Sequence, residues 1–143
     1  MNTHLFYPLT RCVVTLCLSV GVASAAQPKG WQFIGEFESG DKQYIDMSAL
    51  KKERGYVRVR TMINYKRSVW SVTSKRIFSE TGTDYVDCKG RRFMILEAAS
   101  YECPMASCQA KENSSYPFDE KEFKAISSMQ SRVGNVYDLV CQQ

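Results

Sequence analysis

The stretch YVRVRTMINYK, residues 56–66, decides the fold, because its side chains alternate between two kinds. Those on one side of an extended chain are mostly apolar: Val57, Val59, Thr61, Ile63 and Tyr65. Those between them are mostly basic or polar: Arg58, Arg60, Met62, Asn64 and Lys66. A period of two is typical of a strand, so the stretch predicts an antiparallel strand with one buried and one solvated face.

Other extended segments surround this strand. Before it, residues 31–37 (WQFIGEF) and 43–46 (QYID) are predicted strands separated by a turn. After it, residues 69–78, 85–88 and 93–101 read as extended, with residues 80–83 (ETGT) joining the first two. Several aromatic side chains fall at positions expected to pack in the core: Trp31, Phe33, Tyr44, Tyr56 and Tyr65.

The C-terminal segment changes period. Val133, Val136, Tyr137 and Val140 recur at i, i+3, i+4 and i+7, which predicts a short amphipathic helix beginning near residues 130–131. Strands followed by one terminal helix favour an α+β domain, with the helix laid on an antiparallel sheet.

Residues 1–25 have the pattern of a secretory signal peptide. Arg11 precedes an apolar run over residues 12–22, and the segment closes on Ala23-Ser24-Ala25, a small-x-small cleavage pattern. The apolar run is shorter than the roughly 20 residues that cross a bilayer, so a transmembrane span is not expected. Neither Cys12 nor Cys17 follows a small residue, so no lipid anchor is predicted. We therefore expect export, to the periplasm or the outer cell surface, of a single domain over residues 26–143.

Cleavage removes His4 and leaves four cysteines: Cys88, Cys103, Cys108 and Cys141. A chain without histidine has no Ser/His/Asp or Cys/His nucleophile and no zinc site that requires imidazole. An oxidising compartment favours two disulfides over metal ligands, although four cysteines allow three pairings. The carboxylates of residues 119–122 (DEKE) have no expected partner and read as solvated. No enzyme activity, metal or cofactor is expected, and a net charge of +4 does not indicate a nucleic-acid binder.

An ordered set of short motifs resembles a known family. Trp31 opens the first strand with Ile34-Gly35 behind it, and Tyr44-Ile45-Asp46 precedes Ser48. Later come Asn64-Tyr65-Lys66, Tyr85-Val86-Asp87-Cys88 and Arg91-Arg92-Phe93, and finally Ser131 before a helix that ends in Val140-Cys141. Together these motifs resemble the surface-adhesin protein E family of small exported proteobacterial proteins.

The resemblance implies a single antiparallel sheet of about six strands, with a C-terminal helix on one face. It implies that Cys88 pairs with Cys141, which leaves Cys103 to pair with Cys108. Family members are associated with binding host matrix and serum proteins. This chain departs from the best-known surface-exposed type, which is lipid-anchored, and residue-level binding positions are not carried over.

Basic side chains on or beside the central strand are the first binding candidates: Arg58, Arg60, Lys66 and Arg67. Others would extend this cluster if their strands are neighbours: Lys75, Arg76, Lys89, Arg91 and Arg92. The cluster would suit a polyanionic partner such as lipopolysaccharide phosphates, heparin-like glycans or an acidic host protein. The alternative is a solvated, charged sheet face that prevents edge-to-edge aggregation. Trp70, if exposed, would be an anchor for a protein partner.

The sequence therefore predicts a small exported domain that binds rather than catalyses, through one sheet face or an exposed edge. The alternative is a soluble periplasmic accessory or structural protein that makes no contact with a host.

Overall fold

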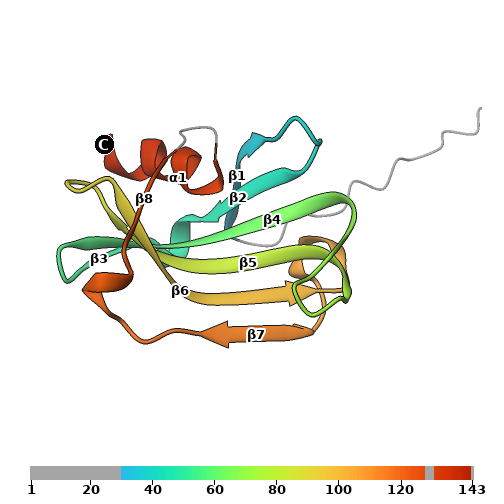
Figure 1. The fold of residues 1–143 in the computed structure, drawn as a ribbon. Coiled ribbons are helices and arrows are strands. Elements are labelled where there is room, and N and C mark those ends of the chain that lie inside the picture. The colour runs from blue at the N-terminus through green and yellow to red at the C-terminus, as the bar shows by residue number, and fades with distance from the viewer. Residues whose placement is uncertain (1–29, 128–130, 143) are drawn as a thin grey trace, which may run out of the picture.

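A computed structural model describes residues 30–127 and 131–142. The expected signal peptide, residues 1–25, lies outside the described residues. These residues form one antiparallel eight-stranded sheet with a single C-terminal helix on one face (Figure 1). This confirms the α+β prediction, with eight strands in place of about six.

Six strands run in the order β1-β2-β4-β5-β6-β7: β1 (Trp31–Glu36), β2 (Lys42–Asp46), β4 (Tyr56–Trp70), β5 (Arg76–Asp87), β6 (Arg92–Tyr101) and β7 (Glu112–Ser115). Two short strands pair off this path: β3 (Lys51–Glu53) with β4, and β8 (Lys124–Ala125) with β6. Three single-turn 3₁₀ helices complete the described elements: η1 (Met47–Ala49), η2 (Pro104–Ala106) and η3 (Glu120–Glu122).

The β4–β5 hairpin differs from the prediction. Residues 69–78 do not form one extended segment, because the chain turns back within them, where Ser71 N donates to Lys75 O at 2.8 Å. Residues 80–83, expected to join two strands, lie inside β5, where Thr61 of β4 faces Gly82. Two long neighbouring strands therefore form the centre of the sheet.

The helix α1 (Arg132–Cys141) packs on one face of this centre. Ser131 is its N-cap and accepts from Gly134 N at 3.1 Å, so the helix begins where the sequence predicted. The core beneath it is aliphatic: Ile45, Val57, Val59 and Val86 from the sheet, with Val136 and Val140 from the helix. A disulfide joins Cys88, just after β5, to Cys141 at the end of the helix.

The opposite face, called here the helix-free face, is not uniformly solvated. Met62, expected to point to solvent, is fully buried there. Trp31, Phe33 and Tyr44 share this face, because cross-strand pairing places Phe33 beside Tyr44 and Tyr44 beside Met62. The expectation that these aromatic side chains pack under the helix was therefore wrong. Phe33 remains 47% exposed.

One end of the helix-free face is covered by the loop that the Cys103–Cys108 disulfide closes. Ser79 Oγ donates to Cys103 O at 2.7 Å and accepts from Ala106 N at 2.9 Å. Met105 N donates to Asn64 Oδ1 at 2.6 Å. The two disulfides are the pairs that the family resemblance implies, and the second one closes a loop that bonds to Asn64 and Ser79.

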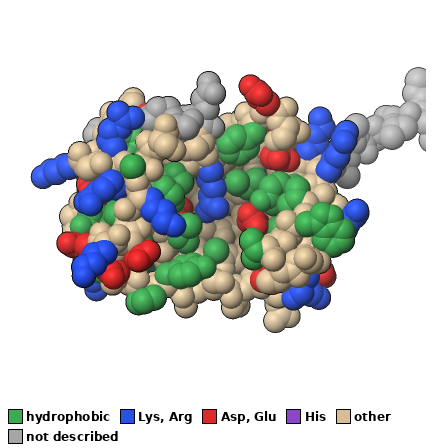
Figure 2. Space-filling model, viewed as in Figure 1, with side chains coloured by type: hydrophobic (Ala, Val, Ile, Leu, Met, Phe, Trp, Pro, Cys, Tyr) green, Lys and Arg blue, Asp and Glu red, His purple; other side chains and the backbone are tan. Residues whose placement is uncertain are grey.

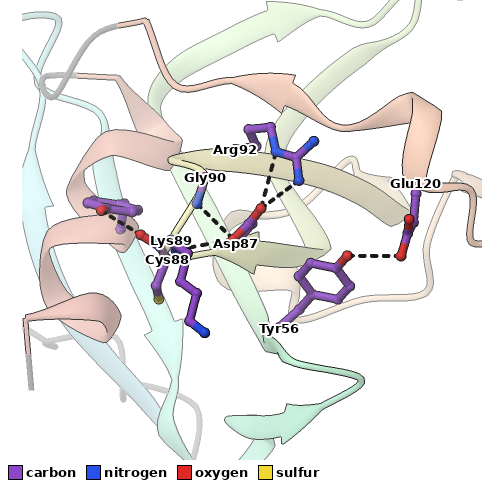
Figure 3. A network of polar contacts seen from close by, with 8 residues as sticks. Tyr56, Asp87, Cys88, Lys89, Gly90, Arg92 and Glu120 are labelled. Atoms are coloured by element: carbon purple, nitrogen blue, oxygen red, sulfur yellow. Dashed lines mark hydrogen bonds and ion pairs between the residues drawn. The ribbon is translucent and has the colours of Figure 1, made fainter.

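Aromatic packing covers the other end. Tyr56 lies 4.8 Å from Phe123 and 6.0 Å from Phe118 between ring centroids, and Tyr85 joins the same cluster. Tyr56 Oη also donates to Glu120 Oε1 of η3 at 3.3 Å (Figure 3). Tyr56, too, therefore lies outside the core beneath the helix.

The β5–β6 turn is closed by Asp87. Its Oδ1 accepts from Lys89 N at 3.1 Å and from Gly90 N at 2.9 Å, and its Oδ2 accepts from Arg92 Nη2 at 2.7 Å (Figure 3). These backbone and guanidinium bonds favour the carboxylate and outweigh its burial, so the pKa of Asp87 lies below its ordinary value. Asp87 and Arg92 thus stabilise this turn, and we assign them no role in binding a ligand.

Candidate functional site

Between its two covers, the helix-free face is hollowed into a groove of about 460 Å³. Side chains from four strands line it: Arg60 of β4, Thr81 and Thr83 of β5, Glu97, Ala99 and Tyr101 of β6, and Asn113 and Ser115 of β7. These positions share one face because the strands pair in register, with Thr83 opposite Glu97 and Thr81 opposite Ala99. Most of these groups are hydroxyl, amide or charged, so the groove suits a polar ligand.

Two arginines lie at one side of this groove: Arg60 lines it, and Arg58 lines a smaller hollow beside it that shares Arg60, Thr83 and Glu97. Arg58 Nη2 lies 3.9 Å from Glu97 Oε1, and Arg60 Nη1 lies 3.8 Å from Asp46 Oδ2. Glu97 also accepts from Thr83 Oγ1 at 3.0 Å. Both ion pairs are long, and the arginine side chains are 37% and 46% exposed, so the pairs contribute little to stability. An acidic group of a ligand could therefore replace either carboxylate.

Trp31 fixes the position of Arg60. The guanidinium carbon of Arg60 lies 5.3 Å from the centroid of the Trp31 ring, a cation–π distance. This contact limits the rotamers of Arg60 without using its N–H groups as donors. Arg60 is thus oriented in advance for a planar acid such as a carboxylate or a sulfate.

The sheet behind the groove is supported from the helix side by Arg132. Its guanidinium crosses over Gly82, donates to Thr61 Oγ1 at 3.0 Å, and lies 3.7 Å from Asp84 Oδ2. A Cβ on Gly82 would lie 1.9 Å from Arg132 Nη2, so any other residue here would displace the guanidinium. Burial raises the pKa of Asp84 to about 6, partly offset by the charge of Arg132.

Gln43 ties this network to the helix. Its Nε2 donates to Arg132 O at 2.7 Å, and its Oε1 accepts from Asn135 Nδ2 at 3.0 Å. The first turn of α1 is therefore held to the sheet by buried polar bonds, while its last turn is held by the Cys88–Cys141 disulfide.

The family follows from a comparison with known protein families. A model of the family described as surface-adhesin protein E matches residues 31–142, which includes every strand and the helix. The chain belongs to the surface-adhesin protein E family. No curated protein matches it. Membership indicates an adhesin-like role at the cell surface and a binding protein rather than an enzyme. Within residues 30–127 and 131–142, none of the helices has the length and apolar character needed to cross a bilayer.

In this member of the adhesin family, the sequence-predicted basic residues do not form one patch. Arg58 and Arg60 lie together at the groove. Lys66 is farther along β4, where its N donates to Asp41 Oδ1 at 2.8 Å and its side chain lies against Gly40. Arg67 and Trp70 lie near the β4–β5 turn, and Trp70 is 67% exposed.

The residues expected to extend the cluster lie elsewhere. Arg76 stacks on Trp70 at 5.2 Å, and Lys75 pairs with Glu112 at 3.4 Å. Lys89, Arg91 and Arg92 lie at the β5–β6 turn, at the opposite end of the sheet (Figure 1). The predicted continuous polyanion surface is therefore replaced by three separate basic regions: the groove, the β4–β5 hairpin and the β5–β6 turn.

Sequence reasoning missed most of the groove: Thr81, Thr83, Glu97, Tyr101 and Asn113. The sequence predicts a connection between two strands at Thr81 and Thr83, because they flank Gly82. In the structure Gly82 lies within a strand, and its lack of a side chain lets the Arg132 guanidinium approach the backbone. The alternation of Thr81, Thr83 and Tyr85 was the available signal, since it continues one strand face across the glycine.

Proposed function

We propose that this adhesin-family domain binds acidic glycan chains in the groove on its helix-free face. Arg58 and Arg60 would contact the carboxylate or sulfate groups, and the hydroxyl and amide side chains of β5 to β7 would contact the sugar hydroxyls. The observation that carries the proposal is the pairing of two weakly engaged arginines with a polar groove of about 460 Å³.

The mixed charge of the groove limits further which class of ligand it can bind. Glu97 lies beside Arg58 and disfavours a second closely spaced anionic group at that point. A chain that alternates acidic groups with neutral hydroxyls therefore fits better than a polyphosphate or a nucleic acid. An acidic protein segment is the second partner class with the same arginine contacts.

Heparin is the probe that tests this proposal. Wild-type protein is expected to bind immobilised heparin and to elute with salt, because the contacts are ionic and exposed. The double variant Arg58→Ala/Arg60→Ala should elute at clearly lower salt. The control Lys52→Ala/Lys89→Ala removes the same charge at exposed positions near the Cys88–Cys141 disulfide. If both variants elute at equally lowered salt concentrations, heparin binding depends on net charge alone, and the assignment of the groove as the binding site is overturned.

We further propose that the domain is displayed on the outer cell surface, where a host glycan is available. Protease shaving or labelling of intact cells, with a known periplasmic protein as control, tests this location. If the chain is protected until the outer membrane is broken, the alternative of a periplasmic accessory protein replaces host binding.

A further inference from the structure

The tip of the β4–β5 hairpin exposes apolar side chains to solvent. This hairpin tip, residues 66–76 (KRSVWSVTSKR), carries Trp70, which is 67% exposed, and Val72, which is fully exposed. Figure 2 shows hydrophobic and basic side chains beside one another at this end of the molecule. Trp70 and Val72 lie two residues apart at one turn, so they form a small exposed apolar point.

The turn that presents these side chains is held by its own hydrogen bonds. Ser71 N donates to Lys75 O at 2.8 Å, Ser74 N donates to Ser71 O at 3.0 Å, and Lys75 N donates to Ser71 Oγ at 3.2 Å. Arg76 stacks on the Trp70 ring at 5.2 Å and donates to Ser68 Oγ at 3.3 Å. The tip is therefore an ordered protrusion rather than a fraying loop.

Basic residues flank the apolar tip on both strands. The eleven residues include four basic side chains, Lys66, Arg67, Lys75 and Arg76, and no acidic one. Glu112 of β7 pairs with Lys75 at 3.4 Å and offsets one of these charges, so the tip region keeps a net positive charge. This combination of a small apolar point and a basic surround matches the layers of an anionic bilayer, in which phosphates lie outside the acyl chains.

The shape favours a membrane over a protein partner. A stable protein interface buries about 800 Å² on each side, far more than one tryptophan and one valine at a turn provide. Tryptophan is enriched at the depth of the lipid headgroups, and each nearby lysine or arginine adds attraction to an anionic surface.

We propose that the hairpin tip docks on an anionic phospholipid bilayer, with Trp70 and Val72 entering the headgroup region and the four basic side chains contacting lipid phosphates. This inference is independent of the glycan proposal. Arg60 and Trp70 are ten residues apart on β4, about 30 Å along a regular strand and somewhat less across the irregularity between Asn64 and Val69. The end of the groove that Arg60 lines thus stays open to solvent when the tip is docked.

Vesicle sedimentation tests the proposal with the mature chain, residues 26–143. Binding is expected to mixed phosphatidylglycerol–phosphatidylcholine vesicles, to weaken with salt, and to be much lower on pure phosphatidylcholine vesicles. Val72→Asp and Trp70→Ser should each reduce partitioning by more than about tenfold. The matched control is Tyr116→Ser, which removes another exposed aromatic side chain far from the tip and should leave partitioning unchanged.

The charge contribution has its own pair of variants. Arg67→Ala/Lys75→Ala should lower partitioning by about fivefold for each residue removed, whereas Lys52→Ala/Lys89→Ala should change it less than about twofold. Equal effects of the two pairs would show that net charge alone drives binding and would overturn the docking geometry.

Fluorescence quenching by brominated lipids reports which tryptophan enters the bilayer. Quenching is expected in the wild type and in Trp31→Phe, and should disappear in Trp70→Phe. No quenching, or quenching that persists in Trp70→Phe, would overturn the proposal. Sedimentation velocity identifies the competing occupant, because a wild-type dimer that becomes monomeric in Val72→Asp, without vesicle binding, would assign the tip to a second copy of the chain.

Discussion

The groove and the hairpin tip lie on the same long strand, yet they are supported in opposite ways. The groove rests on the centre of the sheet, where Arg132 reaches Thr61 and Asp84 from the helix side. The hairpin tip is held by hydrogen bonds within its own turn, and its apolar side chains contact solvent. A site on the groove depends on the whole fold, whereas a site on the tip depends on a few local residues.

This difference separates folding from binding in the two regions. Substitutions beneath the groove should change the free energy of unfolding first and ligand binding as a consequence. Substitutions at the tip should change binding and leave the free energy of unfolding nearly constant. Four predictions test the contrast, from the largest expected change in stability to the smallest.

The first concerns the two disulfides. Replacing Cys88 and Cys141 by serine should lower the free energy of unfolding by about 4 kcal/mol, because their sequence separation of 53 closes a long loop. Cys103→Ser/Cys108→Ser should cost only about 2 kcal/mol, since the separation is 5. Urea denaturation measures both. If the two variants lose the same free energy of unfolding, the contacts of the loop with Asn64 and Ser79, rather than loop closure, determine the loss in Cys103→Ser/Cys108→Ser.

The second concerns the glycine behind the groove. Gly82→Ala places a Cβ 1.9 Å from Arg132 Nη2, so the guanidinium must leave the buried Asp84 carboxylate. Breaking a buried pair in this way should cost about 3 kcal/mol. Gly35→Ala is the matched control, because its Cβ would have its nearest neighbour at 3.8 Å. A tolerated Gly82→Ala would show that Arg132 relaxes freely and does not support the groove.

The same glycine shows why the sequence predicted one part of the molecule better than another. Alternation identified β4, and the i, i+3, i+4, i+7 pattern identified α1, because each reflects contacts of one element with the core. The role of Gly82 depends on a guanidinium fifty residues later in the chain, which no local pattern encodes. The cover at one end of the helix-free face was missed for a related reason, since Met105 bonds to Asn64 across a sequence separation of 41.

The candidate site, too, was predicted where a local pattern encodes it and missed where it depends on residues far apart in the sequence. Alternation correctly placed Arg58 and Arg60 on one face, but it could not show that β5 continues through residues 80–83 and supplies Thr81 and Thr83. Nor could it show that Lys66, placed on the same face by alternation, lies away from the groove, because the pairing of β4 with β5 shifts register between Asn64 and Val69. A bulge of this kind redirects side chains without changing composition.

The third prediction uses pH to probe the buried carboxylate. Asp84 has a folded-state pKa of about 6 against an ordinary value of 3.8, so the folded protein binds its proton more tightly than the unfolded chain does. Stability from this group is therefore greatest at low pH and should fall by about 2 kcal/mol between pH 4 and pH 7. Asp84→Asn should remove this part of the pH dependence. An unchanged slope in Asp84→Asn would place the titration in another group.

The fourth and smallest change is expected at the hairpin tip. Trp70→Ser and Val72→Ser remove side chains that are mostly or fully exposed, so each should alter the free energy of unfolding by less than about 0.5 kcal/mol. Val136→Ala, in the core beneath the helix, serves as the positive control and should cost about 2 kcal/mol. Urea denaturation of the three variants makes the comparison. A loss above about 1 kcal/mol for Trp70→Ser would show that its stacking with Arg76 stabilises the hairpin, and the tip would then need a structural explanation. If Trp70→Ser keeps the free energy of unfolding but loses vesicle binding, Trp70 contributes to membrane binding and not to the stability of the hairpin.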